Sequence, residues 1–161
     1  MPRRLGFALV IVAGALLQTN AAAQRDRQPP YWASISAGNA LMRTGPGRNY
    51  PAIWRYVRAD LPIRVVETYP NWRKVQDPDG ATGWMLRNLL SDTRTAIVRA
   101  TEPAPLHETP DESSAVPYRA EPGVVGRISD CANGWCRLRV RERGGYIQIR
   151  HLWGVDPNEQ L

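Results

Sequence analysis

The sequence of 161 residues lacks long stretches with the 3.6-residue apolar period of an amphipathic helix. It also has only two cysteines and two histidines, which leaves few residues for a metal centre. Its 14 prolines and 13 glycines are instead spread along the chain at intervals, as turns are in an all-β protein. The chain therefore predicts short strands joined by turns.

Motifs of the common hydrolases are missing as well. No G-x-S-x-G sequence is present, and neither cysteine lies in a serine-glycine-cysteine motif. Carboxylates such as Asp111 and Glu112 fall in a proline-bearing, solvated loop rather than in a cluster. We expect a protein that is not an enzyme and needs no cofactor. An acid and a base brought together in a cleft would favour the enzyme alternative.

Basic residues outnumber acidic ones by 21 to 15, a formal net charge of +6. Without Arg3 and Arg4 the balance is 19 − 15 = +4. Many arginines alternate with strand-like residues, among them Arg55 and Arg87. This pattern fits a solvated strand face or an electrostatic surface for an anionic partner. Nucleic acid would be the usual anionic partner, but the export signal described next argues against it.

The N-terminus has the pattern of a secretory signal peptide. Two arginines precede the apolar run Leu5–Leu17, and the small residues 21–23 form an A-x-A cleavage site. We expect a signal peptide over 1–23, with a flexible, polar lead-in over 24–31. An uncleaved anchor is the alternative, although a spanning helix needs about 20 apolar residues. No cysteine lies near the cleavage site, so the expected product is periplasmic or secreted, with no membrane anchor after cleavage.

Both cysteines flank a turn, in Cys131-Ala132-Asn133-Gly134-Trp135-Cys136. Asn-Gly favours a two-residue hairpin, because both residues tolerate positive φ. Such a turn places the two cysteines opposite each other, where an oxidising compartment favours a disulfide. Zinc binding and a catalytic thiol are the alternatives, but only His107 and His151 could join the cysteines as zinc ligands. We therefore expect a structural disulfide and no metal site, and we expect both histidines to be ordinary exposed or half-buried residues.

The sequence also contains an internal repeat. Six anchors recur in order while the offset between the copies falls from 64 to 62 residues. The anchors are Met42/Leu106, Trp54/Tyr118, Arg64/Arg127, Trp72/Trp135, Gly83/Gly145 and Leu90/Leu152. The repeat predicts two domains, 32–92 and 93–157, divided near residues 91–94.

Each copy carries the signals of about five short strands, with alternating residues over 61–67 and 71–75 and another strand from Gly83. Residues 77–80 form a proline-containing turn, and 87–90 suit a single helical turn. We expect the equivalent tryptophans and tyrosines to be buried in each copy.

The first copy resembles the bacterial SH3 (SH3b) domain in its Met42-Arg43-Thr44-Gly45-Pro46-Gly47 start, Asn71-Trp72 and Gly83-Trp84. The second copy, with Gly134-Trp135-Cys136 and Leu152-Trp153-Gly154-Val155, is similar to exported tandem SH3-like proteins of alphaproteobacteria. This resemblance covers roughly residues 31–157. It implies an all-β fold of two consecutive small SH3-like β-barrels after a signal peptide.

The resemblance further implies a module that binds peptidoglycan or a cell-envelope peptide. By analogy with SH3-like grooves, the candidate ligand-binding residues are Arg48, Tyr50, Trp54 and Trp72, with Arg48 contacting an anionic group. Trp72 is also a core candidate because it recurs in both copies, and Arg48 and Tyr50 have no clear counterparts in the second. The alternative is a structural protein that pairs with another envelope protein through a barrel edge or an apolar patch.

Overall fold

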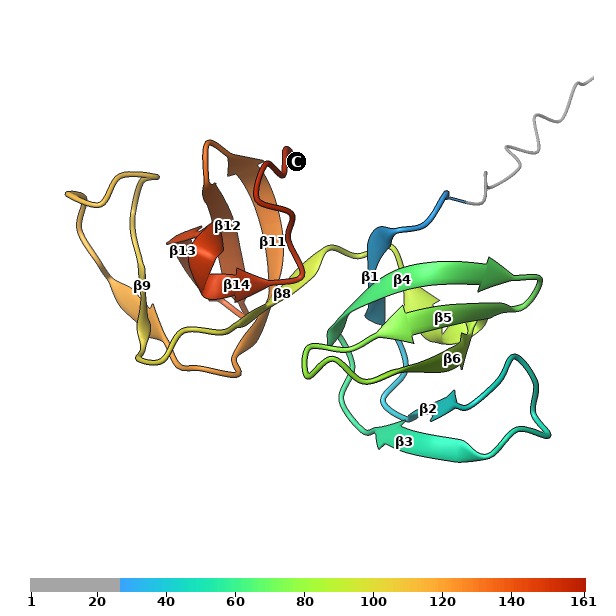
Figure 1. Ribbon diagram of the computed structural model, residues 1–161. Helices are drawn as coiled ribbons and strands as arrows, with labels where there is room; N and C mark the ends of the chain where they lie inside the picture. The colour runs from blue at the N-terminus through green and yellow to red at the C-terminus, as the bar shows by residue number, and fades with distance from the viewer. Residues whose placement is uncertain (1–26) are drawn as a thin grey trace, which may run out of the picture.

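The computed structural model describes residues 27–161, in which the chain folds into two all-β units (Figure 1). The predicted signal peptide and the start of the predicted lead-in lie outside the described residues. The first unit comprises β1 (Tyr31–Ile35), β2 (Ala40–Arg43), β3 (Ala52–Tyr56), β4 (Pro62–Tyr69), β5 (Trp72–Gln76), β6 (Thr82–Leu86), the 3₁₀ helix η1 (Arg87–Leu89) and β7 (Leu90–Ser91). The second comprises β8 (Thr95–Val98), β9 (Ala104–Leu106), β10 (Tyr118–Ala120), β11 (Val125–Ala132), β12 (Trp135–Val140), β13 (Arg143–Gln148), the 3₁₀ helix η2 (Ile149–His151) and β14 (Leu152–Trp153). Neither short helix could cross a bilayer, and residues 27–161 contain no other.

The two units have the same curled sheet. In the first, the strand order is β3-β2-β6-β5-β4-β1-β7, and β2 meets β6 where Arg43 pairs with Trp84. In the second, the order is β13-β12-β11-β8-β14, with β9 and β10 as a separate pair. An isolated bridge between His107 and Tyr146 joins β9 to β13. Because these two residues are the repeat counterparts of Arg43 and Trp84, each sheet closes at the same point.

The internal repeat is confirmed element by element. Its six anchors lie on the pairs β2/β9, β3/β10, β4/β11, β5/β12, β6/β13 and β7/β14. The predicted helical turn at 87–90 is η1, and η2 repeats it in the second unit. Each unit has seven strands rather than about five, because the N-terminal strand and the two-residue last strand are too short or too uniformly apolar to show a period.

The core of each unit is aliphatic rather than aromatic. In the first, it is built from Ala33, Ile35, Ala40, Met42, Ile63, Val65, Val75 and Met85. The expectation of buried aromatic anchors was wrong for Trp54 and its counterpart Tyr118, which are 57% and 40% exposed. Both lie on strands at one end of their sheets, where few neighbours can cover them. Trp72 is 7% exposed, while Trp84 and Trp135 are half-buried.

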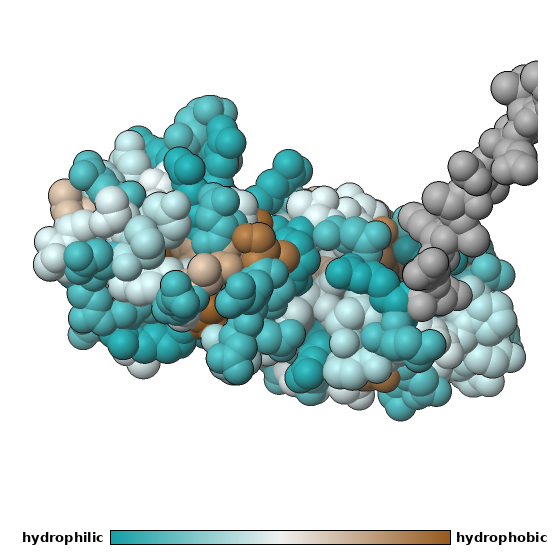
Figure 2. Space-filling model, turned by 90° about the horizontal axis from the view of Figure 1, so that it is seen from above, coloured by the Kyte–Doolittle hydropathy of each residue, from teal (hydrophilic) through white to brown (hydrophobic). Residues whose placement is uncertain are grey.

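Exposed apolar side chains are scattered over the described residues. The large ones are Tyr50, Ile53, Trp54, Val57, Val66, Tyr69, Val116, Tyr118 and Leu161. Seen from above, the surface is predominantly hydrophilic, and the brown residues form only small areas (Figure 2). On this face, polar and charged side chains therefore provide most of the surface available to a ligand.

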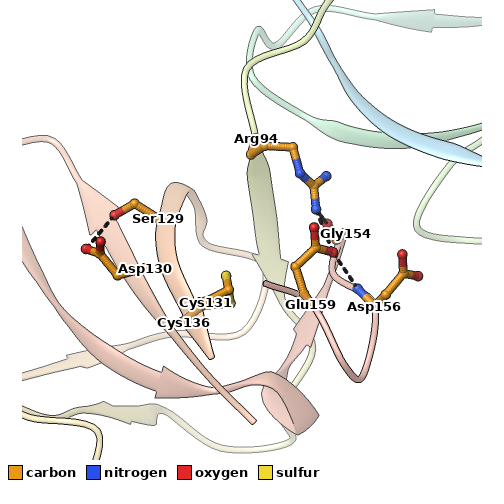
Figure 3. The surroundings of a disulfide bond; sticks show 8 residues. All are labelled: Arg94, Ser129, Asp130, Cys131, Cys136, Gly154, Asp156 and Glu159. Carbon is orange, nitrogen blue, oxygen red and sulfur yellow. Dashed lines mark hydrogen bonds and ion pairs between the residues drawn. A yellow bond between two sulfur atoms is a disulfide. The ribbon is translucent and has the colours of Figure 1, made fainter. Parts of the chain in front are cut away.

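The predicted hairpin and disulfide are both present in the second unit (Figure 3). Asn133 and Gly134 have φ of 51° and 82°, so the turn has positive φ at both central positions. Cys131 and Cys136, both buried, are joined with their Cα atoms 4.0 Å apart. The same strand end is covered by the C-terminal segment, whose Leu161 backbone N–H donates to the Cys131 carbonyl over 3.1 Å.

Side chains from both units meet at the junction. The rings of Trp32 on β1 and Trp153 on β14 pack edge to face, with centroids 4.9 Å apart. Gly154 lies so close to Pro62 that a Cβ at Gly154 would come within 2.9 Å of the proline ring. An ion pair of 2.7 Å between Arg99 and Asp79 adds a polar contact. Since only residues 92–94 separate β7 from β8, these contacts hold the two units against each other.

Removing the disulfide should destabilise the second unit alone. The double variant Cys131→Ala/Cys136→Ala should lower its free energy of unfolding by about 2 kcal/mol, the loop-entropy contribution of so short a loop. Hydrogen exchange resolved by peptide should show faster opening over 95–153 and unchanged exchange over 31–76. Equal acceleration in both units would contradict the separation of the two cores.

Candidate functional site

Two of the four predicted binding residues lie together on the first unit. Two adjoining surface depressions of about 700 and 200 Å³ share Arg48, Trp72 and Leu86 in their walls. Neither depression is lined by Tyr50 or Trp54. The structure therefore brings Arg48 and Trp72 to a common surface. Trp54 lies elsewhere, on the edge strand β3.

Trp72 forms the floor of these depressions. Along β5 it lies three residues from Val75, so the two side chains point to opposite faces of the sheet, and Val75 fills the core. The cross-strand partners of Trp72 are Tyr69 on β4 and Leu86 on β6. Its low exposure thus comes from neighbours on the outer face of the barrel, where a ligand could replace part of this cover.

The walls of the two depressions are strongly cationic. Arg43 and Arg55 line the smaller one, Arg87 lines the larger one, and Arg48 lines both. We call the surface formed by Arg43, Arg48, Arg55, Trp72, Leu86 and Arg87 the arginine groove. Among all residues that line the two depressions, the only carboxylate is Asp92, and its Oδ1 lies 3.2 Å from Arg27 Nη1.

The loop of residues 44–51 holds Arg48 at the groove. The Arg43 guanidinium donates to the Tyr50 carbonyl over 2.7 Å, and the Thr44 N–H donates to the Pro51 carbonyl over 3.0 Å. The Tyr50 ring packs on the backbone of Gly45, where a Cβ would collide with it. Tyr50 is therefore a positioning residue of the loop rather than part of the groove wall.

The second unit has the same loop with different side chains. Residues 108–115 repeat the backbone hydrogen bonds of 44–51, including Glu108 N–H to the Ala115 carbonyl. Glu112 stands where the first unit has Arg48, and His107 stands where it has Arg43. The structure thus identifies Glu112 as the counterpart of Arg48, which the sequence did not make clear. The two residues have opposite charges.

At the equivalent surface of the second unit, these replacements form contacts with their neighbours. The Glu112 carboxylate accepts a hydrogen bond from Gln148, the counterpart of Leu86, and lies 3.6 Å from the Arg150 guanidinium. His107 is buried, so the expectation of an exposed or half-buried histidine was wrong at this position. Its ring packs edge to face on Trp135, with centroids 5.3 Å apart, and its Nδ1 lies 3.2 Å from the Ser114 carbonyl. The two units therefore present different chemistry from the same scaffold.

Two titratable groups outside the arginine groove have pKa values shifted chiefly by burial. The Tyr56 hydroxyl donates to the Asp77 carboxylate over 2.8 Å, and burial followed by this carboxylate raises the pKa of Tyr56. His151 is half-buried, and burial together with the Arg150 charge lowers its pKa. No group of three or more metal-ligating side chains occurs within residues 27–161.

Comparison with known proteins agrees with this architecture. A family model of the bacterial SH3 domain matches residues 36–92 and again residues 100–154. The chain belongs to the bacterial SH3 domain family. It is thus a tandem of two SH3 domains, and the arginine groove lies on the first of them.

More distant similarity extends to two solved structures. The chain is similar to NlpC1 from Trichomonas vaginalis at 15% identity and a TM-score of 0.34, covering 81% of this chain and 48% of that one. It is also similar to NlpC2 from Trichomonas vaginalis at 15% identity and a TM-score of 0.35, covering 79% and 49%. The chain spans about half the length of these proteins. A search of curated proteins finds no match.

Replacing Gly45 should disturb the loop that carries Arg48. In Gly45→Ala the new methyl group would overlap the Tyr50 ring, so the free energy of unfolding should fall by about 1–2 kcal/mol. Gly38→Ala is the matched control, because no atom lies within 4 Å of a Cβ there. Chemical denaturation would measure both variants. An equal loss in the two would contradict the packing of Tyr50 on Gly45.

Proposed function

We propose that this protein is a non-catalytic binding protein of the bacterial cell envelope, located in the periplasm or secreted. Its first SH3 domain would bind peptidoglycan through the stem peptides, or another envelope peptide that carries carboxylates. Bacterial SH3 domains often bind cell-wall components, which supports this class of ligand. The observation that carries the proposal is the arginine groove, where guanidinium groups surround the floor formed by Trp72.

The groove suits a carboxylate-bearing peptide on chemical grounds. A guanidinium group is planar and donates two parallel hydrogen bonds to a carboxylate, which gives both affinity and orientation. Arg48 and Arg55 have no ion-pair or hydrogen-bond partner among the described residues, so both have donors to offer a ligand. The indole of Trp72 and the side chain of Leu86 offer apolar surface to the aliphatic parts of the same ligand.

Two features favour binding without catalysis. No cysteine or histidine lines the arginine groove, and its one neighbouring carboxylate, Asp92, is paired with Arg27. Both cysteines of the chain are joined in the disulfide, so neither is a nucleophile. The disulfide also favours an oxidising compartment, in agreement with the predicted signal peptide.

Sedimentation with purified sacculi would test the proposal. The variant Arg48→Gln should reduce the affinity roughly ten- to hundredfold, because one charge-assisted hydrogen bond contributes roughly 1.5–3 kcal/mol. Arg137→Gln on β12 is a matched control, since it removes the same charge from an exposed residue that lines none of the three depressions. Equal binding by Arg48→Gln and the unchanged protein would exclude the arginine groove as the site.

A second candidate function is pairing with another envelope protein through β3. This strand lies at the end of its sheet, and it and the following residue expose Ile53, Trp54 and Val57. Edge strands with exposed apolar side chains are common pairing sites.

The variant Trp54→Glu distinguishes this candidate from ligand binding in the groove. If β3 is the functional edge, a partner that co-purifies with the unchanged protein should be lost from Trp54→Glu and retained by Arg48→Gln. If the groove is the site, sacculus binding should be unchanged in Trp54→Glu, because Trp54 lines neither depression.

A further inference from the structure

A second arginine-rich surface lies between the two domains. It is a broad depression of about 1380 Å³ that shares no residue with the arginine groove. The first domain contributes Arg58 and Asp60 from the segment between β3 and β4, and the second domain contributes the rest. We call it the interdomain surface, and its arginines are Arg58, Arg119, Arg127, Arg139, Arg141 and Arg143.

Two of these arginines face each other across neighbouring strands. Arg127 on β11 is the direct cross-strand partner of Arg139 on β12, and both side chains are exposed. Like charges in this arrangement are destabilising. At the equivalent positions of the first domain, Arg64 pairs with Gln76. The fold itself therefore accepts a neutral partner, and the second arginine needs an explanation other than folding.

The environment of Arg127 also differs from that of its counterpart. In the first domain the Arg64 guanidinium lies over the Trp32 ring, 5.4 Å from its centroid. In the second domain, the position of Trp32 is occupied by Thr95, which is buried and offers no ring. Arg127 thus lacks the intramolecular partner that occupies Arg64.

The carboxylates nearby do not neutralise this surface. Asp60, Glu121 and Glu142 line the depression, yet none forms an ion pair with any of its arginines in the described part of the chain. The contacts that do occur leave charge available. Arg139 Nε donates to the Arg141 carbonyl over 3.3 Å, and the Arg143 guanidinium stacks on Tyr118, 5.6 Å from the ring centroid.

From these observations we infer that the interdomain surface binds an acidic polysaccharide. Six guanidinium groups along one depression match the repeated negative charges of a linear polyanion. The Tyr118 ring stays 40% exposed beside the Arg143 guanidinium, and this exposed aromatic surface can pack against a sugar. The surface is hollowed between two domains, which favours an extended chain over a flat bilayer. Because the contacts of Trp32 with Trp153 and of Arg99 with Asp79 fix the domains, Arg58 is positioned before the ligand arrives.

Binding of polygalacturonate oligomers, measured by isothermal titration calorimetry on the chain from Gln24 onward, would test this inference. Affinity should rise with oligomer length and fall with added salt, while neutral dextran should not bind. The double variant Arg127→Gln/Arg139→Gln should weaken binding about tenfold. It introduces at 139 the residue type that the first domain has at 76, so its thermal stability should be unchanged or higher.

The matched control is Arg48→Gln/Arg55→Gln, which removes the same two charges from the arginine groove. It should change polygalacturonate affinity less than twofold while weakening sacculus binding. Equal losses in the two double variants would overturn the inference, because binding would then follow net charge alone.

Failure to bind the oligomers, together with capture of phosphatidylglycerol vesicles that depends on Arg127 and Arg139, would also overturn it and identify a membrane as the partner. If the unchanged protein did not bind sacculi, the proposed function would be wrong. This inference would still stand, because the two surfaces share no residue.

Discussion

The alternation of side chains along each strand is the constraint on which both proposed binding surfaces depend. Successive residues of a strand point to opposite faces, so each small barrel can bury only about half of its strand residues. On β2, Met42 belongs to the core while its neighbour Arg43 lines the arginine groove. On β5, Val75 belongs to the core while Trp72 forms the groove floor. The groove is therefore the outer side of the strands whose inner side is the hydrophobic core, and the packing of that core fixes the spacing of the arginines.

The two domains diverge in side chains while the backbone stays the same. The loops 44–51 and 108–115 are closed by equivalent backbone hydrogen bonds, which do not depend on the side chain at their tips. Position 48 can therefore carry an arginine and position 112 a glutamate without any change of loop shape. In the second domain, Glu112 is satisfied within the protein by Gln148 and Arg150. One fold thus provides a cationic groove in the first copy and a paired carboxylate at the equivalent loop position in the second.

Local signals in the sequence were sufficient for the repeat, the strand-rich fold, the hairpin at Asn133-Gly134 and the disulfide. They were insufficient for the site, because the groove depends on which strands become neighbours. Trp54 and Trp72 are indistinguishable as exposed or buried aromatics in the sequence, yet β3 lies at the end of the sheet and β5 in its middle. Arg43 and Arg55 were missed for the same reason, since their convergence requires the pairing of β2 with β3. Aligning the loops through the repeat offset of 64 would have placed Glu112 opposite Arg48, which was the one available signal.

Departures from the repeat also explain why the two domains are not interchangeable. Trp32 corresponds to Thr95, and Trp153 corresponds to Ser91. At each of these positions, one copy has a tryptophan and the other has a residue with a hydroxyl group. The tryptophans then pack on each other across the junction. This pairing has a second consequence, because Trp32 also engages Arg64, whereas Thr95 leaves Arg127 without a ring. The difference between Trp32 and Thr95 therefore has two effects. Trp32 packs on Trp153 at the junction and also holds Arg64, whereas Thr95 leaves Arg127 without an aromatic partner.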